Sequence, residues 1–218
     1  MPLPATDPMG PSRLATSLLA NAAVEGSGGH PYVASAELRE GADAIRNLAD
    51  VIHHLCLLHG RHPGVIDLAA ERSPDDLAGW IGDSAAAFAE ERGLLTRLVV
   101  AAPPLPSTPG QAECEAALLA QRHALEMLAT SERRGCALGT ALALLLDWVA
   151  IREILDLAAT RLGIAIEPAR LPTRAAIGDF AGRIPPVLER AVGFGAGQLY
   201  HQQRGLWDLL ESREQARR

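Results

Sequence analysis

Apolar side chains recur at alternating steps of three and four through several long stretches of the chain. In the first stretch, which begins near residue 37, they are Ile45, Leu48, Ile52 and Leu55. This spacing places them on one face of an α-helix, because the helix turns once every 3.6 residues. Similar patterns predict further long helices over residues 75–102, 111–132, 137–162 and 186–212, and a shorter helix from residue 173.

Local signals mark where two of these helices begin. Ser73-Pro74-Asp75-Asp76 combines an N-cap serine, a proline at the first helical position and acids in the first turn. Thr108-Pro109-Gly110-Gln111 offers a threonine N-cap, with a glutamine able to complete a capping box. A single helix over residues 111–162 would extend roughly 75 to 80 Å, too long for a compact domain of this size. We therefore predict a turn at Arg134-Gly135, where glycine supplies a left-handed conformation.

The stretch 137–162 is apolar on nearly every side, which indicates a helix contacted from several directions at the centre of the fold. Residues 1–35 are rich in proline and glycine and are predicted to form a mobile leader, with room for one short helix over residues 14–24. The sequence thus predicts an all-α protein, with one helical-bundle domain over residues 36–218. Its core is a four-helix bundle, joined by one or two extra C-terminal helices.

The sequence around Gly60 and Pro63 leaves the path of the first helix open. If the helix kinks here, His59 and His62 both stay on the inward face. If it stops at Gly60, His62 belongs to the next segment. A break or kink is favoured, because Pro63 cannot donate a hydrogen bond to the carbonyl of His59.

Composition and charge limit the kinds of molecule that this protein is expected to bind. The net charge is −6, and all 20 basic residues are arginines dispersed among the acids, so binding to nucleic acid is not expected. The complete lack of lysine excludes a lysine Schiff base and a Walker A lysine, and the Arg, Ala and Gly usage is typical of GC-rich bacterial coding. No apolar run reaches 18 residues, so no membrane span is predicted. Three cysteines without a CxxC pair favour reduced thiols in the cytoplasm.

Several polar residues occupy positions where the helical pattern predicts apolar ones. Because a buried ionisable group is costly without a partner, these side chains are expected to pair with each other or to bind a ligand. The candidate metal ligands are His59, His62 and Glu91, and the candidate ligand-binding residues are Gln121, Glu132, Asp147, Arg152 and Gln202. The alternative is that they form isolated hydrogen-bonded pairs that fix the helix register.

Other candidate chemistry has less support in the sequence. Asp50 with His53 or His54 has the spacing of a surface pair on one helix. Ser-His-Asp and Cys-His nucleophile arrangements have no local sequence signature here.

The arrangement of four long helices with polar residues on inward faces resembles the ferritin-like di-iron carboxylate proteins. That resemblance implies a metal ion and oxidoreductase activity, although the Glu-x-x-His pairs of those proteins do not occur in this chain. Gly135-x-x-x-Gly139 is similar to the glycine-containing helix of haem oxygenase-like proteins. The HGRHPG and QRHALE stretches resemble an uncharacterised bacterial family, which implies no activity.

Two functional hypotheses follow. The first is a non-catalytic scaffold or interaction protein, which binds a protein partner or forms a homodimer. The second is a bundle that binds a metal or a small molecule, with ferritin-like or haem oxygenase-like activity. The second hypothesis requires the polar side chains to converge around a cavity, whereas the first predicts dispersed pairs and a dry core.

Overall fold

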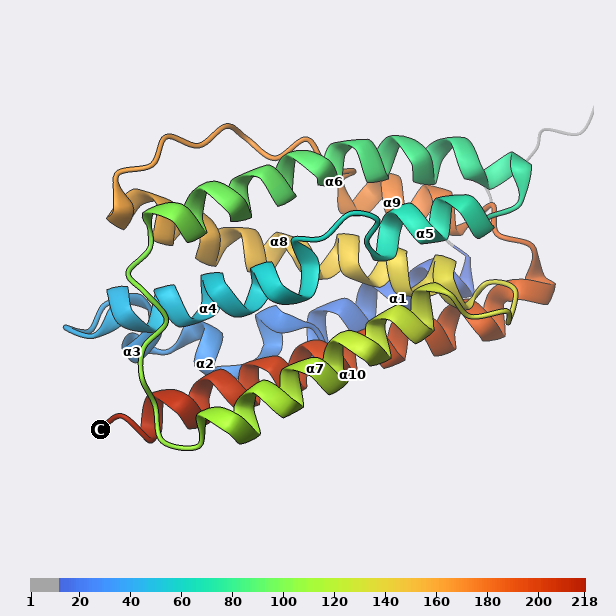
Figure 1. Cartoon of the computed structure of the whole chain (residues 1–218). Helices are drawn as coiled ribbons and strands as arrows, with labels where there is room; N and C mark the ends of the chain where they lie inside the picture. Colours follow the sequence, from blue (N-terminus) through green and yellow to red (C-terminus); the bar gives the residue numbers. More distant parts are fainter. Residues whose placement is uncertain (1–11) are drawn as a thin grey trace, which may run out of the picture.

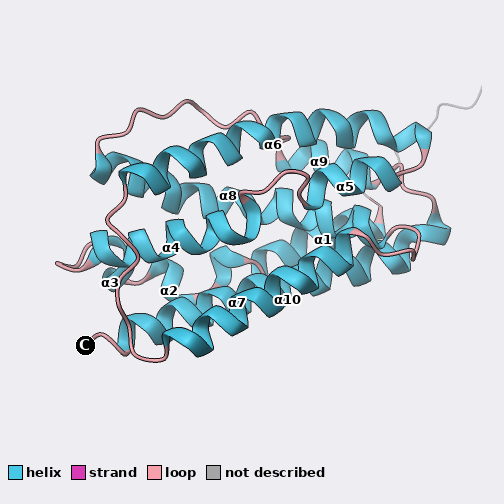
Figure 2. Ribbon diagram, viewed as in Figure 1, coloured by secondary structure: helices cyan, strands magenta, loops and turns pink. Residues whose placement is uncertain are grey.

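The computed structural model describes residues 12–218, and within them all regular structure is helical (Figures 1 and 2). The all-α class predicted from the sequence is confirmed. The elements in chain order are α1 (Arg13–Val24), the 3-10 turn η1 (Ser27–Gly29), α2 (Pro31–Ala34), α3 (Ala36–Arg39), α4 (Ala44–His59), α5 (Val65–Arg72), α6 (Asp75–Ala101), α7 (Gln111–Ala129), α8 (Cys136–Leu162), α9 (Arg174–Ala181) and α10 (Pro186–Gln215). None of these helices is both long enough and apolar enough to cross a membrane.

Helix α8 lies at the centre of the molecule, as its apolar sequence predicts (Figure 1). Helices α1, α4, α5, α6, α7 and α10 all contact it. The C-terminal helix α10 has the most extensive contact with α8. Helix α10 is therefore part of the core. The prediction that four helices alone form the core is not confirmed.

Two glycines allow α8 and α10 to approach closely. A Cβ atom built on Gly139 would lie 2.0 Å from the carbonyl oxygen of Val192, and one on Gly195 would lie 2.1 Å from the carbonyl oxygen of Cys136. Neither distance is compatible with a side chain. The two backbones thus meet at a crossing that only glycine permits.

The helix boundaries agree closely with the sequence, but some of the caps differ. Gly135 adopts the left-handed conformation at the predicted turn, with φ of 93°, directly before α8. At the start of α7, however, the N-cap is the left-handed Gly110, with φ of 75°, and its cap has no side-chain hydrogen bond. Thr108 instead donates to the carbonyl of Pro106. The predicted capping box is therefore absent at this end of α7.

Helix α4 ends after His59 and does not continue as a kinked helix. Helix α4 ends at His59 and α5 begins at Val65, with a cis peptide bond between His62 and Pro63. His59 is buried, whereas the side chain of His62 is 71% exposed. Only one of the two histidines thus faces the core.

The segment predicted as a leader contains helical structure from residue 13 onward. Residues 12–35 form α1, η1 and α2, and they contribute Leu14, Leu18, Tyr32 and Val33 to the hydrophobic core. Helix α1 packs against α9, α10 and α8. Residues 1–11, where the leader was also expected, lie outside the part of the chain that the structure describes.

Candidate functional site

The residues predicted as metal ligands do not gather in one place. His59 Nε2 lies 3.1 Å from Gln203 Oε1, and Glu91 accepts hydrogen bonds from Trp148 Nε1 at 2.9 Å and from an Arg152 nitrogen at 2.5 Å. His62 is exposed. Within residues 12–218, no group of three or more His, Cys, Asp or Glu side chains is placed to hold a metal ion.

Asp147 is buried and receives only hydrogen bonds from neutral groups. Its carboxylate accepts from the backbone N–H of Ser27 at 2.6 Å, from the Ser27 hydroxyl at 2.6 Å and from Gln203 Nε2 at 3.2 Å. Trp207 Nε1 donates to the same hydroxyl at 2.7 Å, so the serine proton is directed at Asp147. Burial raises the pKa of Asp147, while these hydrogen bonds oppose the increase.

The remaining predicted ligand-binding residues make their contacts elsewhere in the fold. Gln121 Nε2 donates to the backbone carbonyl of Gln202 at 3.2 Å, which ties α7 to α10. Glu132 is exposed in the turn between α7 and α8. Arg152 is engaged with Glu91, as described above. The polar residues selected from the sequence therefore meet in small groups and not around one cavity: Gln203 joins His59 to Asp147, Arg152 pairs with Glu91, and Gln121 binds the backbone of Gln202.

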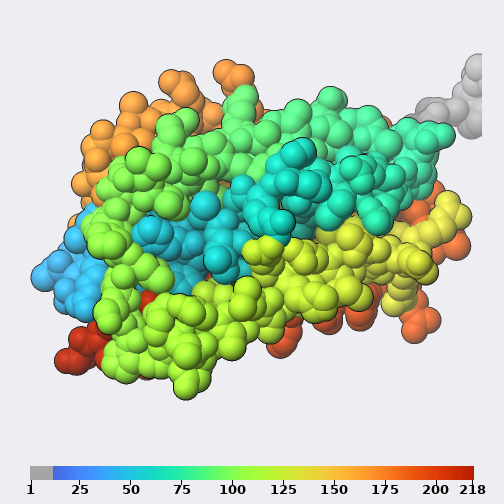
Figure 3. All heavy atoms as spheres, viewed as in Figure 1, coloured from blue at the N-terminus to red at the C-terminus, as the bar shows by residue number. Residues whose placement is uncertain are grey.

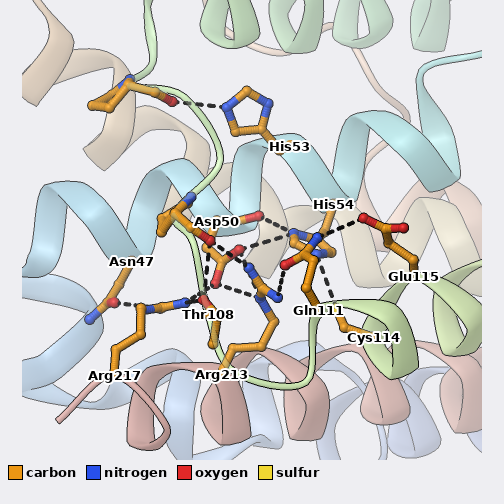
Figure 4. A network of polar contacts seen from close by, with 12 residues as sticks. Asn47, Asp50, His53, His54, Thr108, Gln111, Cys114, Glu115, Arg213 and Arg217 are labelled. Carbon is orange, nitrogen blue, oxygen red and sulfur yellow. Dashed lines mark hydrogen bonds and ion pairs between the residues drawn. The ribbon is translucent and has the colours of Figure 1, made fainter.

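A different network is built around Asp50 on α4, whose side chain is 1% exposed (Figure 4). Arg213 on α10 donates from Nε to both carboxylate oxygens, at 3.0 and 2.9 Å. Arg217 donates to Asp50 Oδ2 at 2.6 Å. Two buried guanidinium groups thus compensate one buried carboxylate.

The two arginines also fix the connection between α6 and α7. Arg213 donates to Gln111 Oε1 at 2.9 Å and to the carbonyl of Pro106 at 3.2 Å. Arg217 donates to Thr108 Oγ1 at 3.0 Å and to Asn47 Oδ1 at 2.9 Å. The C-terminal end of the chain therefore holds this connection in place over α4 (Figure 4).

His54 extends the network toward α7. Its Nδ1 lies 2.6 Å from the backbone carbonyl oxygen of Asp50 and 3.3 Å from the carboxylate oxygen Oδ1 of the same residue. Its Nε2 lies 3.6 Å from the Sγ atom of Cys114. The sequence indicated an Asp50–His54 pair but placed it at the surface, and it gave no signal that Cys114 joins it.

Burial keeps both members of the His54–Cys114 contact neutral. It lowers the pKa of His54, although the carboxylate of Asp50 acts in the opposite direction. It raises the pKa of Cys114, although the guanidinium of Arg213 acts in the opposite direction. At neutral pH the imidazole is therefore an uncharged base next to an uncharged thiol.

A pocket of about 440 Å³ opens beside this network, between α4 and α7. It is lined by His53, His54, Leu57, Leu105, Gln111, Glu115, Leu118 and Leu119. Figure 3 shows the face of the molecule on which α4, α7 and the connection between α6 and α7 meet. Four leucines make most of the wall apolar, and the polar side chains come from both helices.

The fold and site thus define a class of all-helical protein with a buried ion-pair network next to an apolar pocket. The model of a family of unknown function, DUF6975, matches residues 22–218, so the chain belongs to that family. No curated protein and no solved structure matches. No ferritin-like family matches, so that predicted resemblance is unconfirmed.

Proposed function

We propose that this protein binds a small apolar molecule in the pocket between α4 and α7. The observation that supports the proposal is the pocket itself, about 440 Å³ in volume and walled by Leu57, Leu105, Leu118 and Leu119. Ligand sites in proteins are typically cavities of about 300 to 1,000 Å³ with a largely apolar wall and a few fixed polar groups. The pocket has these properties.

The polar side chains at the pocket are held in fixed positions. His53 Nε2 lies 2.9 Å from the carbonyl of Pro103, and Gln111 donates to Glu115 while accepting from Arg213. A polar group that is already oriented costs little entropy when a ligand binds. These side chains therefore supply orientation for a ligand whose bulk is apolar.

The small-molecule proposal is tested by titrating the protein with Nile red, an uncharged dye that fluoresces in apolar surroundings. Leu57→Trp fills the pocket and is expected to weaken dye binding about tenfold or more. Val187→Trp adds the same side chain at an exposed position outside the pocket and serves as the control. Equal dye affinities for the two variants would contradict the proposal.

A second candidate function is self-association, in which the protein binds a second copy of this chain. Leu57 is 40% exposed and Leu119 is 59% exposed, and both lie at the same pocket. Exposed apolar side chains that adjoin one another favour a contact surface. Sedimentation equilibrium tests this candidate, since Leu119→Glu is expected to shift a dimer toward monomer. A wild-type protein that stays monomeric at all concentrations rejects it.

A further inference from the structure

Three chemically complementary groups lie in a row: the Asp50 carboxylate, the His54 imidazole and the Cys114 thiol (Figure 4). Of the three, His54 lines the pocket. The two contacts measure 3.3 Å from Asp50 Oδ1 to His54 Nδ1 and 3.6 Å from His54 Nε2 to Cys114 Sγ. A carboxylate, an imidazole and a nucleophile in this order form the general arrangement of an activated nucleophile.

The hydrogen bonds of His54 determine which nitrogen carries its proton. Nδ1 lies 2.6 Å from the backbone carbonyl oxygen of Asp50, and a carbonyl oxygen can only accept. The proton of the neutral ring is therefore on Nδ1, and Nε2 presents a lone pair. Since Nε2 faces Cys114 Sγ, the thiol is the donor in that contact and His54 has the tautomer of a general base.

Two charged neighbours partly oppose the effect of burial, which disfavours the ion pair that proton transfer creates. Asp50 lies beside the ring and favours the imidazolium form. The guanidinium of Arg213 opposes the increase that burial causes in the pKa of Cys114. Because Arg213 also binds Asp50 through Nε, the carboxylate is held in place by α10. Asp50 and Arg213 are positioning residues in this arrangement.

The pocket brings a bound molecule to this group. His54 forms part of the pocket wall, and so do Gln111, Glu115 and Leu118, the neighbours of Cys114 along α7. Cys114 itself is 4% exposed. It lies behind this wall, in contact with His54. A reactive carbon placed against His54 therefore lies beside the residue that contacts Cys114 Sγ.

We propose that Cys114 accepts an acyl group from an activated ester or thioester whose hydrocarbon chain occupies the pocket. This inference rests on the proposed small-molecule binding and names the class of molecule bound. His54 Nε2 takes the proton of the thiol, and Sγ attacks the acyl carbon to form a C–S bond. The bond from that carbon to its leaving oxygen or sulfur then breaks, the leaving group takes the proton from His54, and the acyl group remains on Cys114.

The experiment uses p-nitrophenyl butyrate as the acyl donor with the full chain. Release of p-nitrophenolate is followed by absorbance, and peptide mass spectrometry locates the butyryl group. We expect about one equivalent to be released rapidly, with the label on Cys114. Cys56 is the matched control, because it lies on α4 and is more exposed than Cys114. Cys56→Ala should leave the reaction unchanged, whereas Cys114→Ala should abolish it.

His54→Asn tests the base separately. Asparagine is able to keep the hydrogen bond to the Asp50 carbonyl but has no counterpart of Nε2. The acylation rate should fall about 100-fold, which is the smaller end of the usual contribution of a positioned base. Circular dichroism verifies the fold, and if this variant unfolds, the comparison of Cys56 with Cys114 decides the result.

Several outcomes overturn the inference. Butyryl label on Cys56, equal labelling of Cys114→Ala, or an unchanged rate in folded His54→Asn would each reject an activated Cys114. Dye binding without any acylation rejects the acyl-transfer inference and leaves the binding proposal intact. Acylation of Cys114 that is insensitive to Leu57→Trp, in a protein that does not bind the dye, rejects the binding proposal and leaves a reactive thiol.

Discussion

At the scale of single residues, Asp50 has the largest predicted effect on stability. It is the counter-charge for Arg213 and Arg217, and all three side chains are almost fully buried. Asp50→Asn leaves two guanidinium groups without their carboxylate, so the free energy of unfolding should fall by about 3 to 5 kcal/mol. Urea denaturation measures the change.

The matched control for Asp50→Asn is Glu126→Gln. Glu126 is also paired with two arginines, Arg61 and Arg122, but its side chain is 52% exposed. Exposed pairs contribute about 0 to 1 kcal/mol, so this variant should be close to wild type. A similar loss in both variants would show that burial of the Asp50 network has no special importance.

His59 is expected to make the protein sensitive to acid. Burial lowers its pKa from 6.5 to about 4, so between these values the unfolded chain binds more protons than the folded one. The free energy of unfolding should therefore fall as the pH decreases from about 6.5 to about 4, by roughly 3 kcal/mol in total. His59→Gln removes this contribution.

Urea denaturation of both proteins at pH 7 and pH 4.5 measures the effect of His59. Asp147, whose pKa is raised, contributes with the opposite sign, because its folded form gains the proton first as the pH decreases. The difference between wild type and His59→Gln separates the two contributions. Parallel pH dependence in the two proteins would count against a buried neutral His59.

The buried glutamine of α10 shows how accurately a sequence pattern predicts the position of a buried polar residue. The periodicity indicated Gln202 on the inward face, whereas the structure buries Gln203 and leaves Gln202 half-buried. Steps of three and four fit a period of 3.6 with an uncertainty of about one residue. Only the neighbours, Asp147 and His59, determine which of the two amides lies inside.

At the scale of elements, the crossing of α8 and α10 depends on its glycines. Gly139→Ala places a methyl group against the backbone of Val192, so the helices must separate and stability should fall by about 3 kcal/mol or more. Gly197→Ala on α10 is the control, because its methyl group meets no atom within 4 Å. That change should stabilise the protein by about 0.5 to 1 kcal/mol.

Thermal denaturation followed by circular dichroism compares these two glycine variants. The expected result is a lower Tm for Gly139→Ala and an equal or higher Tm for Gly197→Ala. A higher Tm for both variants would mean that helix propensity and not the close crossing determines their stability.

Helix boundaries were the most predictable feature of the elements. Periodicity, Pro74 and Gly135 located α6 and α8 to within a residue or two of their observed limits. The start of α7 was less predictable, because Thr108 has a competing partner: Arg217, from the far end of the chain, donates to its hydroxyl. A contact between residues so distant in sequence has no local signal.

At the scale of the whole molecule, the domain boundary is the feature to test. A chain that begins at Ala36 lacks the buried side chains of α1 and α2, and it removes Ser27 from the Asp147 carboxylate. We expect the free energy of unfolding to fall by roughly 5 kcal/mol or more, since each large buried apolar side chain contributes about 1.5 to 3 kcal/mol. Unchanged stability in urea would support the leader predicted from the sequence.

The candidate site also belongs to the scale of the whole molecule. Its residues come from α4, from the segment before α7, from α7 and from α10, and Arg213 joins all of them. The sequence contained one part of it, the helical spacing of Asp50 and His54. It gave no reason to select Cys114, because nothing near that cysteine differs from an ordinary buried position.

By itself, the sequence determined the helical class, the limits of the long helices and the central place of α8, because periodicity, prolines and glycines act on nearby residues. Only the tertiary structure decided that α10 is the main partner of α8, that residues 12–35 belong to the core and that Asp50, His54 and Cys114 meet. These features depend on contacts between distant parts of the chain. Such contacts are selected by packing and by the pairing of buried charges, which local patterns do not specify.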